Sequence, residues 1–176
     1  MANKEALREL QSRLAERLKL QGDSSRADSA TWLAVECADR GLLLPLEQAG
    51  EIFPLSPMVA VPHTVPWFLG VANLRGRLHG VVDLAGFLGL RTAATGEAVR
   101  EQSRLVAFNP ALDINCALLV DRLAGLRSLD QLRADPHSGP RPAFAGRSWT
   151  DSAGRNWQEL QLSALAGHDA FLKVAR

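Results

Sequence analysis

Residues 66–84, PWFLGVANLRGRLHGVVDL, contain the most distinctive pattern in the chain. At its centre, Asn73-Leu74-Arg75-Gly76 is typical of a tight turn, because Asn tolerates left-handed backbone geometry and Gly adopts any φ angle. A turn here would direct Arg75 outward, where its planar guanidinium suits a contact of fixed geometry with a carboxylate or a backbone carbonyl. On the residues alone, Arg75 could equally be a solubilising side chain at a loop tip.

Short apolar runs also occupy the sequence on both sides of this stretch. They alternate with turns, and each is too short for a typical helix: 32–37, 42–46, 78–84, 105–108 and 116–120. The turn at 38–41 joins the first two runs as a hairpin, and four prolines make 54–66 an extended loop. Leu84–Leu90 predicts a short helical turn closed by Gly89. Many short strands predict an all-β architecture built on barrels.

A weak internal repeat supports two related subdomains. PWFLG at 66–70 matches PAFAG at 142–146, and Val-Asp-Leu at 82–84 matches Leu-Gln-Leu at 160–162. Each half also opens with two apolar strands, so the repeat predicts two small barrels of similar build.

The N-terminal part of the chain has a different character. Residues 3–20 predict a helix with a narrow apolar stripe, formed by Leu7, Leu10, Leu14 and Leu18, and charged residues on its other faces. This stripe would pack on the rest of the chain or, alternatively, on a partner. Residues 21–31 are small and polar, as in a linker. We therefore divide the chain into a helix with its linker at 1–30 and a β domain at 31–172.

Composition excludes several classes of function. The chain has 176 residues and a net charge of +1, which gives no support for a strongly basic nucleic-acid binder or a polybasic membrane-surface protein. Apolar residues make up 47% of the chain, yet no apolar stretch is long enough to span a membrane. The charged start, Met1–Arg8, is unlike a secretory signal. Cys37 and Cys116 form no close-spaced motif, so we expect buried thiols in a reducing cytoplasm.

Catalytic and ligand-binding patterns are missing from the sequence. None of the four histidines has another histidine at i+3 or i+4, and none lies in a Cys/His cluster with zinc-ligand spacing. Gly70 and Gly76 are wrongly spaced for a phosphate-binding loop. Asp83 and Asp121 each follow an apolar strand, where forming a turn is the ordinary role. The sequence therefore predicts no catalytic residue, cofactor or metal site, and a protein that is not an enzyme.

Taken in order, the motifs resemble those of CheW-like domains. The resemblance covers roughly residues 31–172 and rests on PWFLGVANLRG at 66–76 with VVDL at 81–84, LPLEQAGEI at 44–52, LLVDRL at 118–123 and the closing strand at 157–165. The family implies an all-β fold of two intertwined, five-stranded SH3-like barrels packed around a shared core. The predicted N-terminal α-helix would be an addition to that fold.

The resemblance also implies a function. CheW-like adaptors are non-enzymatic and join the cytoplasmic tip of a chemoreceptor to the regulatory domain of a CheA-like histidine kinase. The adaptor would be cytoplasmic, recruited to membrane-associated receptor arrays, monomeric when free, and without nucleic-acid binding or membrane insertion. By this resemblance, Glu51, Gly70 and Arg75 match family positions implicated in receptor coupling. Asn73, Leu74 and Gly76 complete the turn that presents Arg75. Together they make the predicted receptor-binding set: Glu51, Gly70, Asn73, Leu74, Arg75 and Gly76.

The type of signalling system and two other functions stay open on the sequence. The charged helix and the WQEL sequence at 157–160 resemble the PilI-type adaptors of type IV pilus (twitching motility) systems, although a flagellar adaptor with an extension would look much the same. A small-barrel nucleic-acid-binding protein is one alternative, since five aromatic residues could stack on bases: Trp32, Trp67, Phe68, Trp149 and Trp157. An unrecognised enzymatic site is another.

Overall fold

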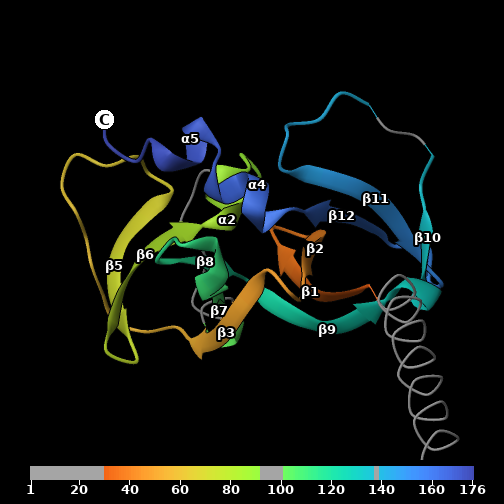
Figure 1. Cartoon of the computed structure of the whole chain (residues 1–176), viewed down its shortest axis with the longest axis horizontal. Helices are drawn as coiled ribbons and strands as arrows, with labels where there is room; N and C mark the ends of the chain where they lie inside the picture. Colours follow the sequence, from red (N-terminus) through yellow and green to blue (C-terminus); the bar gives the residue numbers. More distant parts are fainter. Residues whose placement is uncertain (1–29, 92–100, 137–138) are drawn as a thin grey trace, which may run out of the picture. The chain divides into compact units, whose positions relative to one another are not determined.

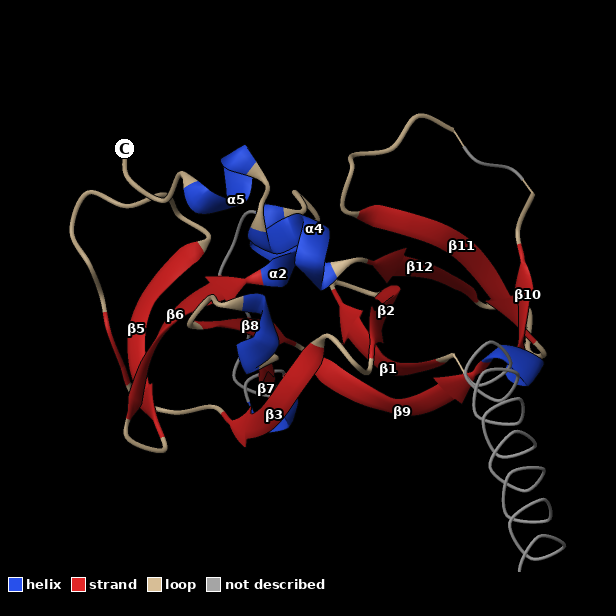
Figure 2. Cartoon of the chain, in the orientation of Figure 1, coloured by secondary structure: helices blue, strands red, loops and turns tan. Residues whose placement is uncertain are grey.

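The computed structural model describes residues 30–91, 101–136 and 139–176. The predicted helix at 3–20 and most of its linker lie outside these residues. Thr31–Arg176 form a compact unit built mainly of strands (Figures 1 and 2).

The described residues form twelve strands and several short helices (Figure 1). The strands are β1 (Thr31–Cys37), β2 (Arg40–Pro45), β3 (Ala49–Pro54), β4 (Met58–Val59), β5 (Phe68–Leu74), β6 (Arg77–Asp83), β7 (Arg104–Phe108), β8 (Cys116–Val120), β9 (Arg122–Ser128), β10 (Leu132–Ala134), β11 (Ala145–Asp151) and β12 (Asn156–Leu160). The α-helices are α2 (Leu84–Phe87), α4 (Leu162–Ala166) and α5 (Asp169–Leu172), and the 3-10 helices are η1 (Pro110–Leu112) and η2 (Leu129–Gln131). No helix among the described residues is long and apolar enough to cross a membrane.

The strands make two sheets, which confirms the predicted pair of barrel-like subdomains. Over the described residues, sheet A has the order β10-β11-β12-β2-β1-β9 and sheet B has the order β3-β7-β8-β6-β5-β4. Each sheet contains one very short strand: β10 in sheet A has three residues, and β4 in sheet B has two. Without these, each sheet has the five strands that the family resemblance implies.

The internal repeat is confirmed as a structural one. Six strands and a short helix, β1–β6 with α2, are followed by an equivalent series, β7–β12 with α4. The same backbone hydrogen bond precedes both helices. Asp83 N donates to Trp67 O and Gln161 N donates to Phe144 O, each at 2.8 Å.

The two repeats exchange strands between the sheets. β1 and β2 lie in sheet A with β9–β12, whereas β7 and β8 lie in sheet B with β3–β6. The chain therefore crosses from sheet A to sheet B between β2 and β3, and returns between β8 and β9. Each sheet gains one parallel pair from this exchange, β2 with β12 and β6 with β8.

The core joins the sheets and also fills the inside of sheet B. A large apolar cluster contains buried residues of both sheets, such as Val35 and Leu44 from sheet A and Val82 and Leu118 from sheet B. The short helices α4 and α5 contribute to it, and Figure 1 shows them beside α2 where the sheets meet. A second cluster of mostly small side chains, including Leu74, packs within sheet B. Burial of this apolar surface is the main stabilising contribution to the fold.

Candidate functional site: the β5–β6 turn and its surroundings

The turn between β5 and β6 is as tight as a hairpin allows. Leu74 pairs with Arg77, so Arg75 and Gly76 alone form the connection. Both have positive φ angles, +50° and +81°, as in the turns that match the natural twist of paired strands. The left-handed geometry predicted for Asn73 therefore falls on Arg75 and Gly76 instead. Asn73 remains in β5, and its Oδ1 accepts a hydrogen bond from Gly76 N at 2.8 Å.

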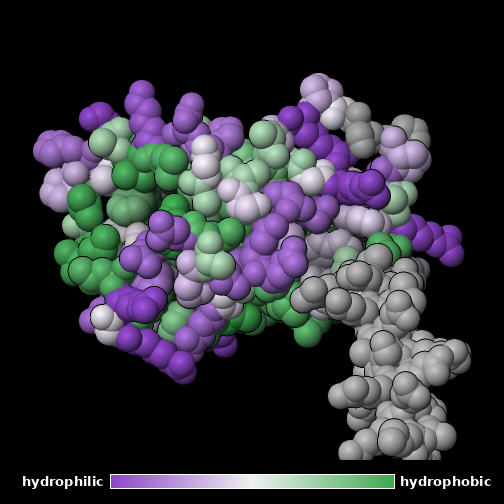
Figure 3. All heavy atoms as spheres, in the orientation of Figure 1, coloured by the Kyte–Doolittle hydropathy of each residue, from purple (hydrophilic) through white to green (hydrophobic). Residues whose placement is uncertain are grey.

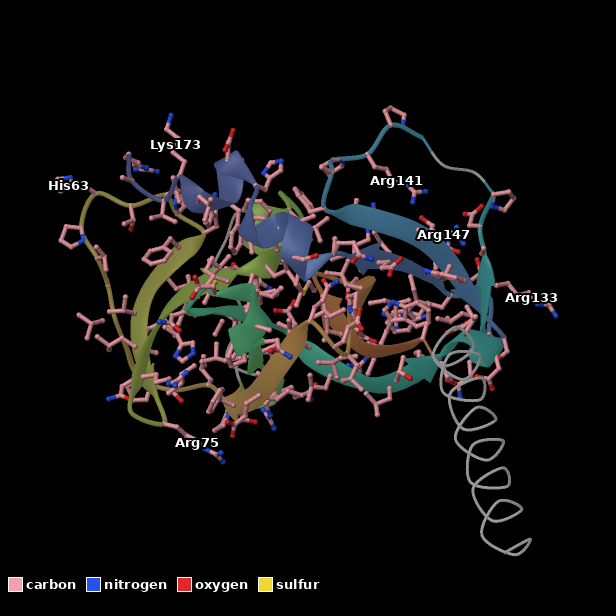
Figure 4. The ribbon with its side chains drawn as sticks, viewed as in Figure 1. His63, Arg75, Arg133, Arg141, Arg147 and Lys173 are labelled. Atoms are coloured by element: carbon pink, nitrogen blue, oxygen red, sulfur yellow. The ribbon has the colours of Figure 1, made fainter. Side chains whose placement is uncertain are left out.

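Arg75 meets another residue of the predicted set across the barrel surface. Its Nη1 lies 2.8 Å from Oε1 of Glu51 in β3, and the two side chains are 76% and 42% exposed. Figure 4 shows Arg75 pointing from the end of the β5–β6 hairpin into solvent. An ion pair this exposed contributes about 0.2–1 kcal/mol to stability. Either partner can therefore exchange its contact for one on another protein at little cost to the fold.

Two members of the predicted set lie inside the barrel. Gly70 is buried with φ +134°, and a Cβ atom there would lie 2.2 Å from the carbonyl oxygen of Val59 in β4. Leu74 is 3% exposed and packs in the core of sheet B. Neither residue is available to touch a partner. The exposed members are Glu51, Arg75, Asn73 and Gly76.

The fold leaves several apolar side chains exposed on the strands of sheet B that carry or adjoin these residues. Leu78, opposite Asn73 in β6, is 66% exposed, and Val59 in β4 is 70% exposed. Ile52 is also exposed, next to Glu51 in β3. Figure 3 shows hydrophobic residues gathered over the β4–β6 part of sheet B. Sequence reasoning missed these residues, because the two-residue alternation that places the polar Arg77 and His79 on the outer face would place Leu78 on the opposite, inner face. Large exposed apolar residues beside an exposed ion pair favour a protein-binding surface.

The rest of the described chain offers little for catalysis or ligand binding. No group of three or more His, Cys, Asp or Glu side chains in the described residues could hold a metal ion. Burial raises the pKa of both free thiols, Cys37 and Cys116, to about 12, so neither is a ready nucleophile. The alternative of base stacking loses its best candidates, since Trp32, Trp149 and Trp157 are buried.

Asp83 and Asp121 have a role that the sequence did not suggest. Both carboxylates bind the guanidinium of Arg91, at 2.7 Å and 2.6 Å, and all three side chains are largely buried. They are structural partners of one buried cation, where turn formation was predicted. Spacing could not reveal this contact, because it depends on β6 and β8 being neighbours in sheet B.

Comparison with known proteins found a matching family and two proteins of similar sequence. The protein family described as the CheW-like domain matches residues 31–170. Protein PilI of Pseudomonas aeruginosa is 29% identical over 168 residues, which cover 93% of this chain and 89% of that protein. A probable chemotaxis protein CheW of Rhizobium etli is 34% identical over 61 residues, which cover 35% of this chain and 39% of that protein.

The crystal structure of the scaffolding protein TtCheW from Thermoanaerobacter tengcongensis has a similar fold. Its TM-score is 0.63 at 17% sequence identity, covering 76% of this chain and 89% of that one. The match agrees with the two-sheet architecture described above.

Proposed function

The chain belongs to the CheW-like domain family of scaffold adaptors, and from this we propose that it couples chemoreceptors to a CheA-like histidine kinase. The coupling needs no chemistry in the adaptor. One surface holds the receptor tip, another holds the regulatory domain of the kinase, and a change in receptor state alters kinase activity through differential contacts across the bridge. The kinase supplies ATP binding and the phosphorylated histidine.

The observation that carries the proposal is the exposed Glu51–Arg75 pair on a rigid two-residue turn. A carboxylate on the receptor tip would compete with Glu51 for Arg75, and apolar side chains of the receptor would cover Leu78 and Val59. The hairpin fixes the backbone of Arg75, and the ion pair with Glu51 orients its guanidinium before the receptor arrives.

The six predicted residues then divide into two roles. Glu51 and Arg75 contact the receptor directly. Asn73 and Gly76 maintain the turn at the surface, while Gly70 and Leu74 position the hairpin from inside the barrel. A contact residue and a positioning residue should both lose receptor binding when changed, but only the positioning residue should also lose stability.

We further propose that the adaptor serves a type IV pilus system, operates in the cytoplasm at receptor arrays, and is monomeric when free. The similarity to PilI over most of the chain supports the pilus assignment.

Capture of partners from a bacterial lysate that contains intact signalling arrays tests this proposal. We expect the wild-type protein to retain both a CheA-like kinase and a chemoreceptor. Arg75→Ala should lose the receptor, because the guanidinium that contacts it is gone. The variant should retain the kinase, because the turn and the fold survive without that side chain. Arg133→Ala is the matched control, since Arg133 is an exposed arginine of β10 in sheet A (Figure 4).

Two results would contradict different parts of the proposal. Normal receptor capture by Arg75→Ala would remove the β5–β6 turn as the receptor site. Failure of the wild-type protein to capture either partner would remove the coupling function itself. The identity of the captured receptor distinguishes a pilus system from a flagellar one.

A further inference from the structure

A buried charged cluster lies at the ends of the parallel strands β6 and β8. Asp83 ends β6, and Asp121 directly follows β8. Arg91 donates from Nη2 to Asp83 Oδ1 at 2.7 Å, from Nε to Asp83 Oδ2 at 3.2 Å, and from Nη1 to Asp121 Oδ1 at 2.6 Å. The three side chains are between 13% and 15% exposed. We call this group the Arg91 cluster.

The guanidinium makes this arrangement of carboxylates tolerable. Parallel neighbours end at the same edge of a sheet, so side chains at their ends lie close together. Two carboxylates held there with little water would repel each other. Arg91 binds Asp83 with two nitrogens and Asp121 with the third, a geometry that a planar fork provides and a single ammonium does not.

The cluster also reaches sheet A. Asp121 Oδ2 accepts a hydrogen bond from Ala38 N at 2.8 Å, and Ala38 lies in the turn between β1 and β2. Both residues of that turn have positive φ angles, +47° at Ala38 and +66° at Asp39, although neither is glycine. Asp121 is moreover the residue at which the chain leaves sheet B for sheet A. One carboxylate thus contacts the Arg91 guanidinium, the crossover and the strained turn.

The other crossover is tied by amides, one of which, Gln161, also donates from Nε2 to the carboxylate Oε1 of Glu159 at 2.9 Å. Gln161 follows β12 as Asp83 ends β6, and Gln48 precedes β3 at the crossover from sheet A to sheet B. Gln48 Nε2 donates to Gln161 Oε1 at 3.0 Å, and Gln48 Oε1 accepts from Ser163 N at 3.1 Å. Amides bond to each other directly and need no cation between them. Each crossover is therefore tied to the end of a strand beside it, once by charges and once by amides.

We propose that Arg91 is a positioning residue that fixes the β8–β9 crossover, and with it the orientation of sheet A relative to sheet B. The consequence for signalling rests on the proposed function: a partner bound to one barrel can act on a partner bound to the other only if the two barrels move together. The orientation itself can be measured without any partner.

A distance measurement between the sheets tests the first step. Spin labels are attached to cysteines introduced by Arg77→Cys in β6 and Arg133→Cys in β10, both exposed positions. The native thiols are buried and should remain unlabelled. We expect Arg91→Leu to broaden the distribution of distances between the labels about twofold, because the two sheets would then sample a wider range of relative orientations. Arg40→Leu, a change at an exposed arginine of β2, is the matched control and should leave the width unchanged.

A neutral version of the cluster separates charge repulsion from lost packing. Combining Arg91→Leu with Asp83→Asn and Asp121→Asn removes the repulsion, and the amide oxygen at 121 can still accept from Ala38 N. We expect this triple variant to restore most of the narrow distribution. A wild-type width in folded Arg91→Leu overturns the proposal. If Arg91→Leu does not fold, Arg91→Lys decides, since one ammonium should give an intermediate width and a wild-type width overturns the proposal.

The functional step has its own readout. Arg91→Leu should still capture the receptor through Arg75 but should lose receptor control of kinase activity. Intact control with a broadened distance distribution would overturn the signalling role of Arg91 while leaving the proposed adaptor function in place. Loss of all partner capture in the wild-type protein would instead overturn the adaptor function.

Discussion

Replacing Gly70 by alanine should destabilise the barrel far more than the same change at Gly76. Both glycines have positive φ angles, +134° and +81°, but only Gly70 is crowded. At Gly70 the new Cβ atom would lie 2.2 Å from Val59 O and 2.8 Å from Val59 C. These are backbone atoms of β4, so the contact can be relieved only by moving that strand. At Gly76 nothing lies within 4 Å of the new atom.

The two costs can be estimated separately. Placing alanine at the φ angle of Gly70 costs about 1–3 kcal/mol, and displacing β4 adds about 1–3 kcal/mol. A total of about 2–6 kcal/mol is a large part of the 5–15 kcal/mol by which a typical domain is stable. For a domain of this size it lowers Tm by about 4–24 °C. Gly76→Ala bears only the left-handed strain, about 1–2 kcal/mol.

Urea unfolding followed by tryptophan fluorescence measures both free energies of unfolding, and calorimetry measures both Tm values. The reasoning is refuted if Gly70→Ala is no less stable than Gly76→Ala. The same pair of variants also tests whether a residue that supports the fold affects receptor capture. Gly70→Ala should weaken receptor capture even where the variant is folded, because β4 and the hairpin shift.

Two further predictions concern titratable groups. Burial acts to raise the pKa of Glu36, but hydrogen bonds from Arg155 and Arg122 outweigh it and hold the pKa below its ordinary range. Glu36 therefore stabilises the fold above its unfolded pKa, and this contribution is lost as pH falls below about 4.3. Denaturation curves should show that acid lowers the free energy of unfolding less in Glu36→Gln than in the wild type. Equal decreases in the two proteins would contradict the assignment. Because burial raises the pKa of Cys37 and Cys116 to about 12, iodoacetamide at neutral pH should alkylate both thiols quickly only in denaturant, and rapid alkylation of the native protein would contradict their burial.

Local features of the fold follow from the sequence because they depend on neighbouring residues. The hairpin at 38–41 and the turn at 73–76 were predicted from turn-forming residues between apolar runs, and both occur. The helical turn at Leu84–Leu90 also occurs, with Gly89 at φ +68°. The repeat between 66–70 and 142–146 correctly indicated two similar subdomains. In each case, backbone conformation and side-chain alternation leave few alternatives.

Contacts between distant segments did not follow from the same reasoning. Spacing gave no sign that Glu51 and Arg75 would form an ion pair, because they join through the curvature of sheet B. The pairing of Asp83 and Asp121 on Arg91 was missed for a related reason. It requires β6 and β8 to be parallel neighbours, and that follows only from the exchange of strands between the two repeats. A short repeat in sequence shows that two halves are alike but not which strands each half gives to the other.

The motif NLRG combines residues that build the hairpin with a residue that the hairpin presents. Leu74 anchors the end of β5 in the core, and Asn73 accepts the hydrogen bond of Gly76 that closes the turn. With those constraints met, the turn determines where Arg75 lies but puts almost no demand on its side chain, which is 76% exposed. Because the φ angle there is +50°, selection on fold alone would favour Gly, Asn or Asp at that position. An exposed arginine paired with Glu51 is therefore stronger evidence for a partner-binding role than the buried residues beside it. A motif carried over from relatives gains meaning once its buried and exposed members are separated, since only exposed members can touch what the protein binds.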